Sequence, residues 1–369
     1  MRLCDRRLSL RNILAAILPA AGLLLISCGR QQQAVNTGQG SAGRSSGIGL
    51  NGAGATFPAP LYAQWADAYR NATGVEINYA AIGSGGGISQ IEARTVDFGA
   101  SDAPLTMDQL EKSGLIQFPA IIGGVVLAYN LPGFNGEVKL DGPTVADIFL
   151  GKIKNWNDPR IAQLNPGTKF PLVAITPVYR SDGSGTTFIF TSYLSKISPA
   201  WKSSVGADKT VQWPTGVGGK GNPGVAGFVK QIGGGIGYVE YAYAKSNSLP
   251  TATLKNQDGQ FVRPSSAAFA AAAAKANWDP TQGFAVSLTD QRGADSWPIV
   301  GASFILIPSQ PPDPERAKEV LKFFDWAFKN GGDAANKLDY VPLPQNAIDA
   351  IRQVWSGIKG TNGKSVTNS

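Results

Sequence analysis

Residues 173–196 of this 369-residue chain read VAITPVYRSDGSGTTFIFTSYLSK. The apolar run at 173–179 predicts a strand, the polar segment 180–185 a loop, and residues 186–196 a helix. The same order of strand, loop and helix recurs along the chain. Strands that alternate with helices predict an α/β fold with mostly parallel sheets.

The polar loops at these junctions carry the functional information, because ligands of α/β folds bind where strands end and helices begin. Three such loops are rich in glycine and hydroxyl groups: GATFP at 54–58, GSGGG at 83–87 and RSDGSGTT at 180–187. Taken singly, the first is more simply a helix cap and the second a turn. The third combines the Arg180 guanidinium with hydroxyls and N–H groups, which suits a tetrahedral oxyanion. An Arg180–Asp182 pair beside a capped helix is its alternative.

The first 27 residues predict a bacterial lipoprotein signal peptide. Four arginines precede an apolar run at 13–26, as in a secretory signal, and this run is short for a membrane-spanning helix. It ends in LISC at 25–28, which looks like a lipobox cleaved before a lipidated Cys28. Ordinary cleavage nearby, or an uncleaved anchor, are the alternatives. Residues 28–50, rich in Gln, Ser and Gly, predict a lipid-anchored flexible tether.

The composition excludes several kinds of chemistry. The chain contains no histidine, which removes histidine-based triads, histidine–metal sites and imidazole acid–base catalysis. Cys4 leaves with the predicted signal and Cys28 is the lipid acceptor, so no thiol pair remains for a disulfide or a cysteine-bound metal. Part of the net charge of +7 lies in the signal, and the remainder is too mild to indicate nucleic-acid binding.

Five segments together carry a resemblance to a known family: GAGATFPAP at 52–60, VDFGASDAP at 96–104, DGSGT at 182–186, IGYVEY at 236–241 and LKFFDW at 321–326. These motifs resemble those of the phosphate-binding protein of Pst-type ABC transporters, the PstS family. The likeness runs from about residue 51 to about residue 360.

The resemblance implies a type II periplasmic-binding-protein fold, in which two α/β lobes joined by crossing strands close on a ligand in the cleft between them. Lobe 1 would comprise residues 51–130 and 302–369, and lobe 2 residues 131–301. The long apolar runs at 121–130 and 302–307 fit crossing strands. Lobe closure would complete the site, which is a hinge motion coupled to binding.

The resemblance also implies a set of phosphate ligands in the loops. Backbone N–H groups and hydroxyls would donate, Arg180 would add a charge-assisted bond, and Asp102 would accept. Asp182 could hold the Arg180 guanidinium in place. The implied phosphate-binding residues are Ala55, Thr56, Phe57, Ser84, Asp102, Arg180, Ser184, Gly185 and Thr186. No catalytic residue, metal or cofactor is implied.

Asp102 would discriminate between anions. By position alone it is a helix cap before a turn. As a carboxylate it can only accept hydrogen bonds, so it needs a proton on the ligand. Phosphate carries a proton near neutral pH and sulfate does not, so we expect phosphate to bind and sulfate to be rejected.

We therefore expect a non-enzymatic, high-affinity binding protein that delivers phosphate to an ABC importer. Its partners would be a membrane permease, an ATPase and, through Cys28, the membrane. It would be a monomer in the periplasm or on the outer face of the cell membrane. The alternatives are a binding protein for sulfate, molybdate or a phosphonate, a secreted phosphatase with Ser84 or Ser184 as nucleophile, and an envelope protein without a ligand.

Overall fold

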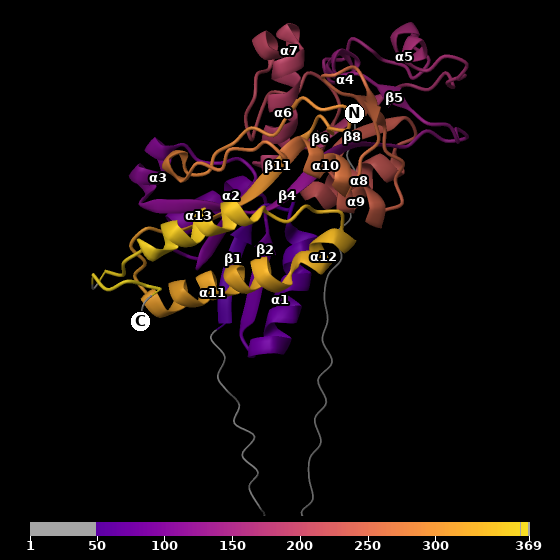
Figure 1. Cartoon of the computed structure of the whole chain (residues 1–369). Helices are drawn as coiled ribbons and strands as arrows, with labels where there is room; N and C mark the ends of the chain where they lie inside the picture. Colours follow the sequence, from indigo (N-terminus) through magenta and orange to yellow (C-terminus); the bar gives the residue numbers. More distant parts are fainter. Residues whose placement is uncertain (1–48, 362, 368–369) are drawn as a thin grey trace, which may run out of the picture. The chain divides into compact units, whose positions relative to one another are not determined.

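The computed structural model describes residues 49–361 and 363–367. The predicted signal peptide, Cys28 and nearly all of the predicted tether lie outside the described residues. Within them, strands and helices alternate as the sequence predicts, so the α/β class is confirmed (Figure 1).

Eight strands form one mixed sheet in the order β2-β1-β3-β11-β4-β8-β6-β7. Its strands are β1 (Gly49–Gly54), β2 (Glu76–Ala81), β3 (Phe98–Ser101), β4 (Leu115–Tyr129), β6 (Thr176–Arg180), β7 (Val217–Gly219), β8 (Gly235–Glu240) and β11 (Val300–Pro308). A smaller sheet contains β5 (Lys139–Leu140), β9 (Thr253–Lys255) and β10 (Phe261–Val262).

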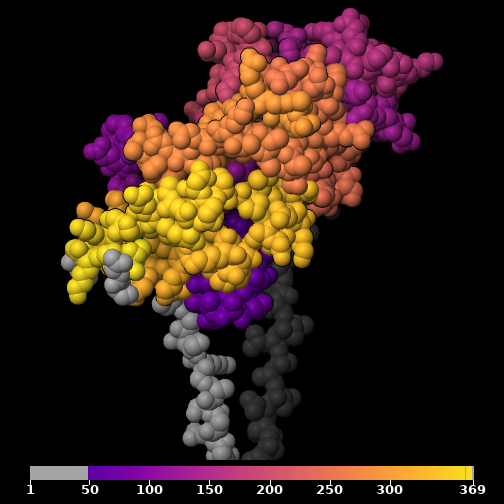
Figure 2. Space-filling model, viewed as in Figure 1, coloured from indigo at the N-terminus to yellow at the C-terminus, as the bar shows by residue number. Residues whose placement is uncertain are grey.

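Helices follow most of these strands. They are α1 (Ala59–Thr73), α2 (Ser84–Glu92), α3 (Met107–Ser113), α4 (Gly142–Phe149), α5 (Pro159–Leu164), α6 (Gly185–Ile197), α7 (Pro199–Ser204), α8 (Gly221–Gln231), α9 (Tyr241–Ser246), α10 (Ser266–Ala273), the 3-10 turn η1 (Pro280–Gln282), α11 (Pro314–Asn330), α12 (Gly332–Lys337) and α13 (Gln345–Ser356). Helices α11 and α12 pack on α1. On the face in Figure 2, the yellow C-terminal segments accordingly lie against the indigo N-terminal ones.

The pairing in the large sheet is parallel at its two ends and antiparallel in its middle. β2, β1 and β3 form one parallel group, the β1 group, and β8, β6 and β7 form another, the β6 group. The central strands β11 and β4 pair antiparallel with each other and with the group on either side. The expectation of mostly parallel sheets is therefore wrong at the centre of the large sheet. There β4 and β11 lie between the two parallel groups and run antiparallel to each other and to their neighbours. The predicted lobe boundaries stay a prediction.

Strand β1 was missed by the sequence analysis. Gly49 and Leu50, placed at the end of the tether, belong to β1, and Leu50 is fully buried. The sequence GLNGAG contains no β-branched residue and so lacks the usual strand signal. Its glycines have a packing reason, because a Cβ on Gly52 would lie 2.1 Å from the ring of Phe98. Position 52 of β1 is therefore glycine because the Phe98 ring occupies the space that a side chain would take.

We predict that Gly87→Ala destabilises the fold by about 1–3 kcal/mol, as expected for overpacking. Gly87 lies in α2, directly on β1 and β3, and an added Cβ would meet backbone atoms of Gly54, Ala53 and Ala100 at 2.5–2.8 Å. Urea unfolding measures the change. Gly227→Ala in α8 is the control, because its Cβ would meet no atom within 4 Å. It should be neutral or stabilising by up to about 1 kcal/mol, and equal losses in both variants would contradict this account of α2.

Candidate oxyanion site

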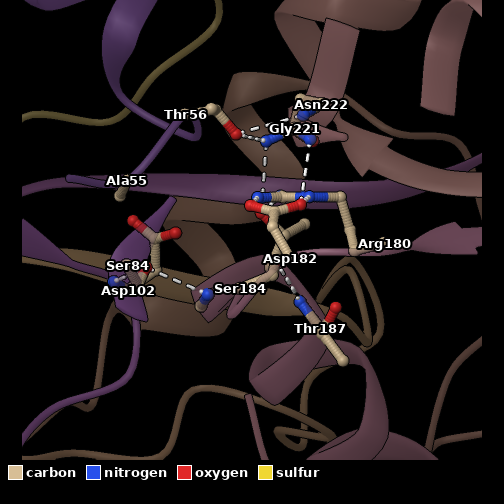
Figure 3. A network of polar contacts seen from close by, with 12 residues as sticks. Ala55, Thr56, Ser84, Asp102, Arg180, Asp182, Ser184, Thr187, Gly221 and Asn222 are labelled. Atoms are coloured by element: carbon tan, nitrogen blue, oxygen red, sulfur yellow. Dashed lines mark hydrogen bonds and ion pairs between the residues drawn. The ribbon is translucent and has the colours of Figure 1, made fainter. Parts of the chain in front are cut away.

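The three glycine-rich loops meet at one buried place. β1, β2 and β3 are parallel neighbours, so their carboxyl ends share one edge of the sheet. Backbone bonds join the loops there: Gly83 N–H donates to the Gly54 carbonyl over 2.8 Å, and Gly85 N–H to the Gly183 carbonyl over 2.9 Å. All the phosphate-binding residues predicted from the sequence are buried: Ala55, Thr56, Phe57, Ser84, Asp102, Arg180, Ser184, Gly185 and Thr186. Figure 3 shows Ala55, Thr56, Ser84, Asp102, Arg180 and Ser184 close together.

The Ser84 hydroxyl links the β1 group to the β6 group. Its oxygen accepts the N–H of Asp102 over 3.2 Å and the N–H of Gly185 over 3.0 Å. In this structure the Gly185 N–H, predicted to donate to a ligand, therefore donates to Ser84. A Cβ on Gly185 would lie 2.5–2.7 Å from atoms of Asp102, so only glycine allows this approach.

Arg180 is held by Asp182 at the start of the third loop. Its Nε donates to Asp182 Oδ1 over 2.8 Å and its Nη2 to Oδ2 over 2.5 Å, a bidentate pair. The Gly221 N–H also donates to Oδ1, over 2.9 Å. Burial alone would raise the pKa of Asp182, but the bonds and charge of Arg180, together with the Gly221 N–H, lower it. Asp182 thus stays ionised and fixes the plane of the guanidinium.

Thr56 does not cap helix α1, so that interpretation of the first loop is wrong. The cap position is Pro58, without a side-chain bond. The Thr56 hydroxyl instead accepts hydrogen bonds from Asn222 in α8, from its backbone N–H over 3.1 Å and from Nδ2 over 2.8 Å. The sequence analysis did not identify Asn222. It follows the glycine-rich stretch VGGKG at 217–221, a strand-to-helix junction like the three glycine-rich loops.

Backbone donors surround these side chains. Among the described residues, no acceptor is found for the N–H groups of Thr56 and Phe57. Ser84 and Thr186 lie in the first turns of α2 and α6, where N–H groups have no partner within the helix. The Ser184 hydroxyl accepts the Thr187 N–H over 3.0 Å as the cap of α6. The site is therefore rich in donors.

Asp102 is the acidic group of the site. It is 2% exposed, and its Oδ1 has no hydrogen-bond partner among the described residues. Burial raises the pKa of Asp102 to about 7, although the Ser303 hydroxyl, the Arg180 charge and the Ser84 hydroxyl each lower it. The carboxyl is thus poised to gain or lose a proton near neutral pH.

A second buried carboxyl, Glu240, is connected to the first loop through Tyr340. The Tyr340 hydroxyl lies 2.6 Å from the Phe57 carbonyl oxygen and 2.8 Å from Glu240 Oε2. A phenol has one hydrogen, so both contacts are hydrogen bonds only if Glu240 is protonated and donates to Tyr340. Burial raises the pKa of Glu240 to about 8, which agrees with a neutral carboxyl. Glu240 lies in the segment IGYVEY, but nothing in that segment indicated a buried acid.

We predict that Glu240→Gln flattens the pH dependence of stability between about pH 4.5 and 8. The pKa of Glu240 is about 8 in the folded chain, against an ordinary value of 4.5. Folding therefore takes up a proton in this range, and the free energy of unfolding falls as pH rises, by up to about 1.4 kcal/mol per pH unit. Glutamine removes this contribution.

Urea unfolding at several pH values measures both slopes. Glu111→Gln, at an exposed position of α3, is the control and should keep the wild-type slope. If the curves of the wild type and Glu240→Gln run parallel across this range, Glu240 is already ionised in the folded protein.

The chain is similar to known proteins over most of its length. A family model described as a PBP superfamily domain matches residues 31–330. The phosphate-binding protein PstS of Pasteurella multocida is 55% identical over 319 residues, which cover 86% of this chain and 93% of the relative. That of Haemophilus influenzae is 55% identical over 307 residues, covering 83% and 92%. The PstS of Methanocaldococcus jannaschii is 38% identical, covering 84% and 88%.

Solved structures share the fold at lower identity. A high-affinity periplasmic phosphate-binding protein solved with bound phosphate, PfluDING, is 20% identical with a TM-score of 0.68, covering 85% of this chain and 99% of its own. The phosphate-binding protein of Stenotrophomonas maltophilia is 22% identical with a TM-score of 0.66, covering 87% and 98%. The predicted type II periplasmic-binding-protein fold is thus confirmed. On its sequence, this chain belongs to the PstS family of phosphate-binding proteins.

Proposed function

We propose that this chain binds inorganic phosphate and passes it to an ABC importer. The observation that carries the proposal is the composition of the buried site, in which N–H, O–H and guanidinium donors surround the Asp102 carboxyl, while the other carboxyl there, Asp182, is bound to Arg180. Such a site replaces the water around an anion with fixed donors, and the Asp102 carboxyl matches an anion that carries a proton. The naming of the relatives as phosphate-binding proteins supports the same ligand.

The ligand set proposed is that of the sequence analysis, with Arg180 as the cationic group. The donors would come from both the β1 group and the β6 group, so the ligand would be enclosed between them. We retain the proposal of two lobes, 51–130 with 302–369 and 131–301, joined by crossing strands. It is supported by the two parallel groups on either side of β4 and β11.

The selectivity proposed depends on the protonation of Asp102. As a carboxylate, Asp102 accepts a hydrogen bond from the O–H of phosphate, whereas sulfate presents only lone pairs to it. When protonated, it can donate to either anion. Because its pKa is about 7, rejection of sulfate should be strongest above that pH.

A binding role is favoured over catalysis. A serine nucleophile needs an adjacent base, and the chain contains no histidine. The Ser84 and Ser184 oxygens accept backbone N–H groups instead. No group of metal-ligating side chains occurs within residues 49–361 and 363–367. We therefore propose no enzymatic activity.

The export and anchoring proposed rest on the sequence pattern. A signal over residues 1–27 and a lipid on Cys28 would hold the domain in the periplasm or outside the cell membrane, as a monomer, beside the permease and ATPase. In the part of the chain that the structure describes, no helix is both long and apolar enough to cross a membrane.

Calorimetric titration of the chain from residue 29, freed of anions, tests the function directly. We expect one-to-one binding of phosphate at pH 8 and no heat with sulfate. Binding of sulfate or molybdate in preference to phosphate would favour another oxyanion carrier. No binding of any anion, or turnover of a phosphate ester, would overturn the proposal.

We predict that Asp102→Asn binds sulfate at pH 8 and has lost most of its discrimination. The amide can donate to an anion without a proton, where the carboxylate opposes its lone pairs. A mismatch of about 3 kcal/mol corresponds to roughly 100-fold in affinity. Titrations between pH 5.5 and 8.5 check it: the wild type should gain sulfate affinity below pH 7 and the variant should not. Unchanged discrimination in the variant would remove Asp102 from the selectivity mechanism.

A further inference from the structure

The side chain of Asn222 contacts the loop of the β1 group and that of the β6 group. Asn222 is the second residue of α8 and is fully buried. Its Oδ1 accepts the backbone N–H of Glu240 over 2.9 Å, which fixes the orientation of the amide. Nδ2 therefore faces the hydroxyls of Thr56, at 2.8 Å, and Thr186, at 3.2 Å. Figure 3 shows Asn222 beside Thr56, next to Arg180 and Asp182.

The Thr56 hydroxyl can form one more hydrogen bond, and only as the donor. Its oxygen accepts two N–H groups, the backbone N–H and Nδ2 of Asn222. Neither nitrogen can accept a hydrogen bond, so the direction of both bonds is certain. A hydroxyl has one hydrogen and two lone pairs, and both lone pairs are engaged. The Thr56 hydrogen must therefore be donated to another group.

The Thr186 hydroxyl is in the same state. Its oxygen accepts Nη1 of Arg180 over 3.3 Å and Nδ2 of Asn222 over 3.2 Å. Both donors are again nitrogens without an available lone pair. The hydrogen of Thr186 is free for donation, as is that of Ser84, whose oxygen accepts two backbone N–H groups.

We propose that Asn222 is a positioning residue, which makes the Thr56 and Thr186 hydroxyls obligate donors to the bound anion and joins their two loops around it. This inference rests on the proposed phosphate function. Backbone N–H groups occupy both lone pairs of the Ser84 hydroxyl. The Thr56 and Thr186 hydroxyls each need the Asn222 side-chain amide to occupy one of theirs. Asn222 therefore sets the hydrogen-bond polarity of the site without being one of its ligands.

Replacing the amide changes the hydroxyls in two distinguishable ways. Asn222→Ala removes one of the two donors to each hydroxyl and leaves the backbone N–H of residue 222 on Thr56 and Nη1 of Arg180 on Thr186. Each hydroxyl hydrogen can then turn to a second direction, and we expect phosphate affinity to fall about tenfold, the lower end of what a hydrogen bond to a charged group contributes. Asn222→Asp has nearly the same shape, and its ionised carboxylate presents only acceptors. Both hydroxyl hydrogens would then turn toward residue 222 and away from the anion, so we expect a loss of about 100-fold or more.

The test is calorimetric titration of the wild type, Asn222→Ala and Asn222→Asp with phosphate, with urea unfolding of each in the absence of anion. Asn165→Asp is the matched control, because Asn165 is a buried asparagine whose Nδ2 donates to the Lys139 and Ile161 carbonyls, outside the site. It should lower stability but leave the phosphate Kd of the folded protein unchanged.

A double-mutant cycle separates positioning from a structural role. If Asn222 acts through Thr186, then Asn222→Ala should cost less affinity in a Thr186→Val background than in the wild type. Additive losses, or an unchanged Kd in folded Asn222→Ala, would overturn the proposal. If Asn222→Asp does not fold, the phosphate affinity of Asn222→Ala and the double-mutant cycle test the proposal. Absence of phosphate binding by the wild type would instead refute the proposed function.

Discussion

The Ser84 hydroxyl, with its bonds to the N–H groups of Asp102 and Gly185, is the contact on which the site depends. These two backbones come from opposite sides of the central strands β11 and β4, and one oxygen joins them. The approach is close enough that Gly185 cannot carry a Cβ. Once the strand end at Asp102 and the start of α6 are this near, the other loop residues are buried as well. Every polar group among them then needs a partner, because an unpaired buried group costs several kcal/mol.

That requirement explains the directions of the hydrogen bonds. The Ser84, Thr56 and Thr186 oxygens each accept two N–H groups, so their hydrogens are left for a ligand. Asp182 offsets the charge of Arg180, and Asp102 is poised between its charged and neutral forms. The site therefore has a surplus of donors and little fixed negative charge, which is the complement of an oxyanion.

A second connection holds the first loop from behind. Tyr340, Tyr79 and Tyr243 donate to the carbonyls of Phe57, Ala55 and Thr56, respectively, within 2.6–2.7 Å. These bonds occupy the carbonyls of the first loop, whereas no acceptor among the described residues is found for the N–H groups of Thr56 and Phe57. Glu240 completes this support as a neutral acid beside Tyr340. Two buried acids with raised pKa values thus serve different purposes, one at the proposed phosphate position and one holding the loop.

The fold class of this protein and the loops of its candidate site could be predicted from the sequence alone. Alternating apolar runs predict the α/β class, and glycine- and hydroxyl-rich loops at strand ends predict an oxyanion site, because local patterning decides both. β1 escaped because GLNGAG has no strand signal, and its glycines make sense only beside the ring of Phe98. Asn222 and Thr56 are 166 positions apart, and Tyr340 and Glu240 are 100 apart. No local pattern reveals such pairs. Whether a hydroxyl donates or a carboxyl keeps its proton depends on the partners that folding brings to it, so the sequence determined which groups are present and the tertiary structure decided which way their hydrogens point.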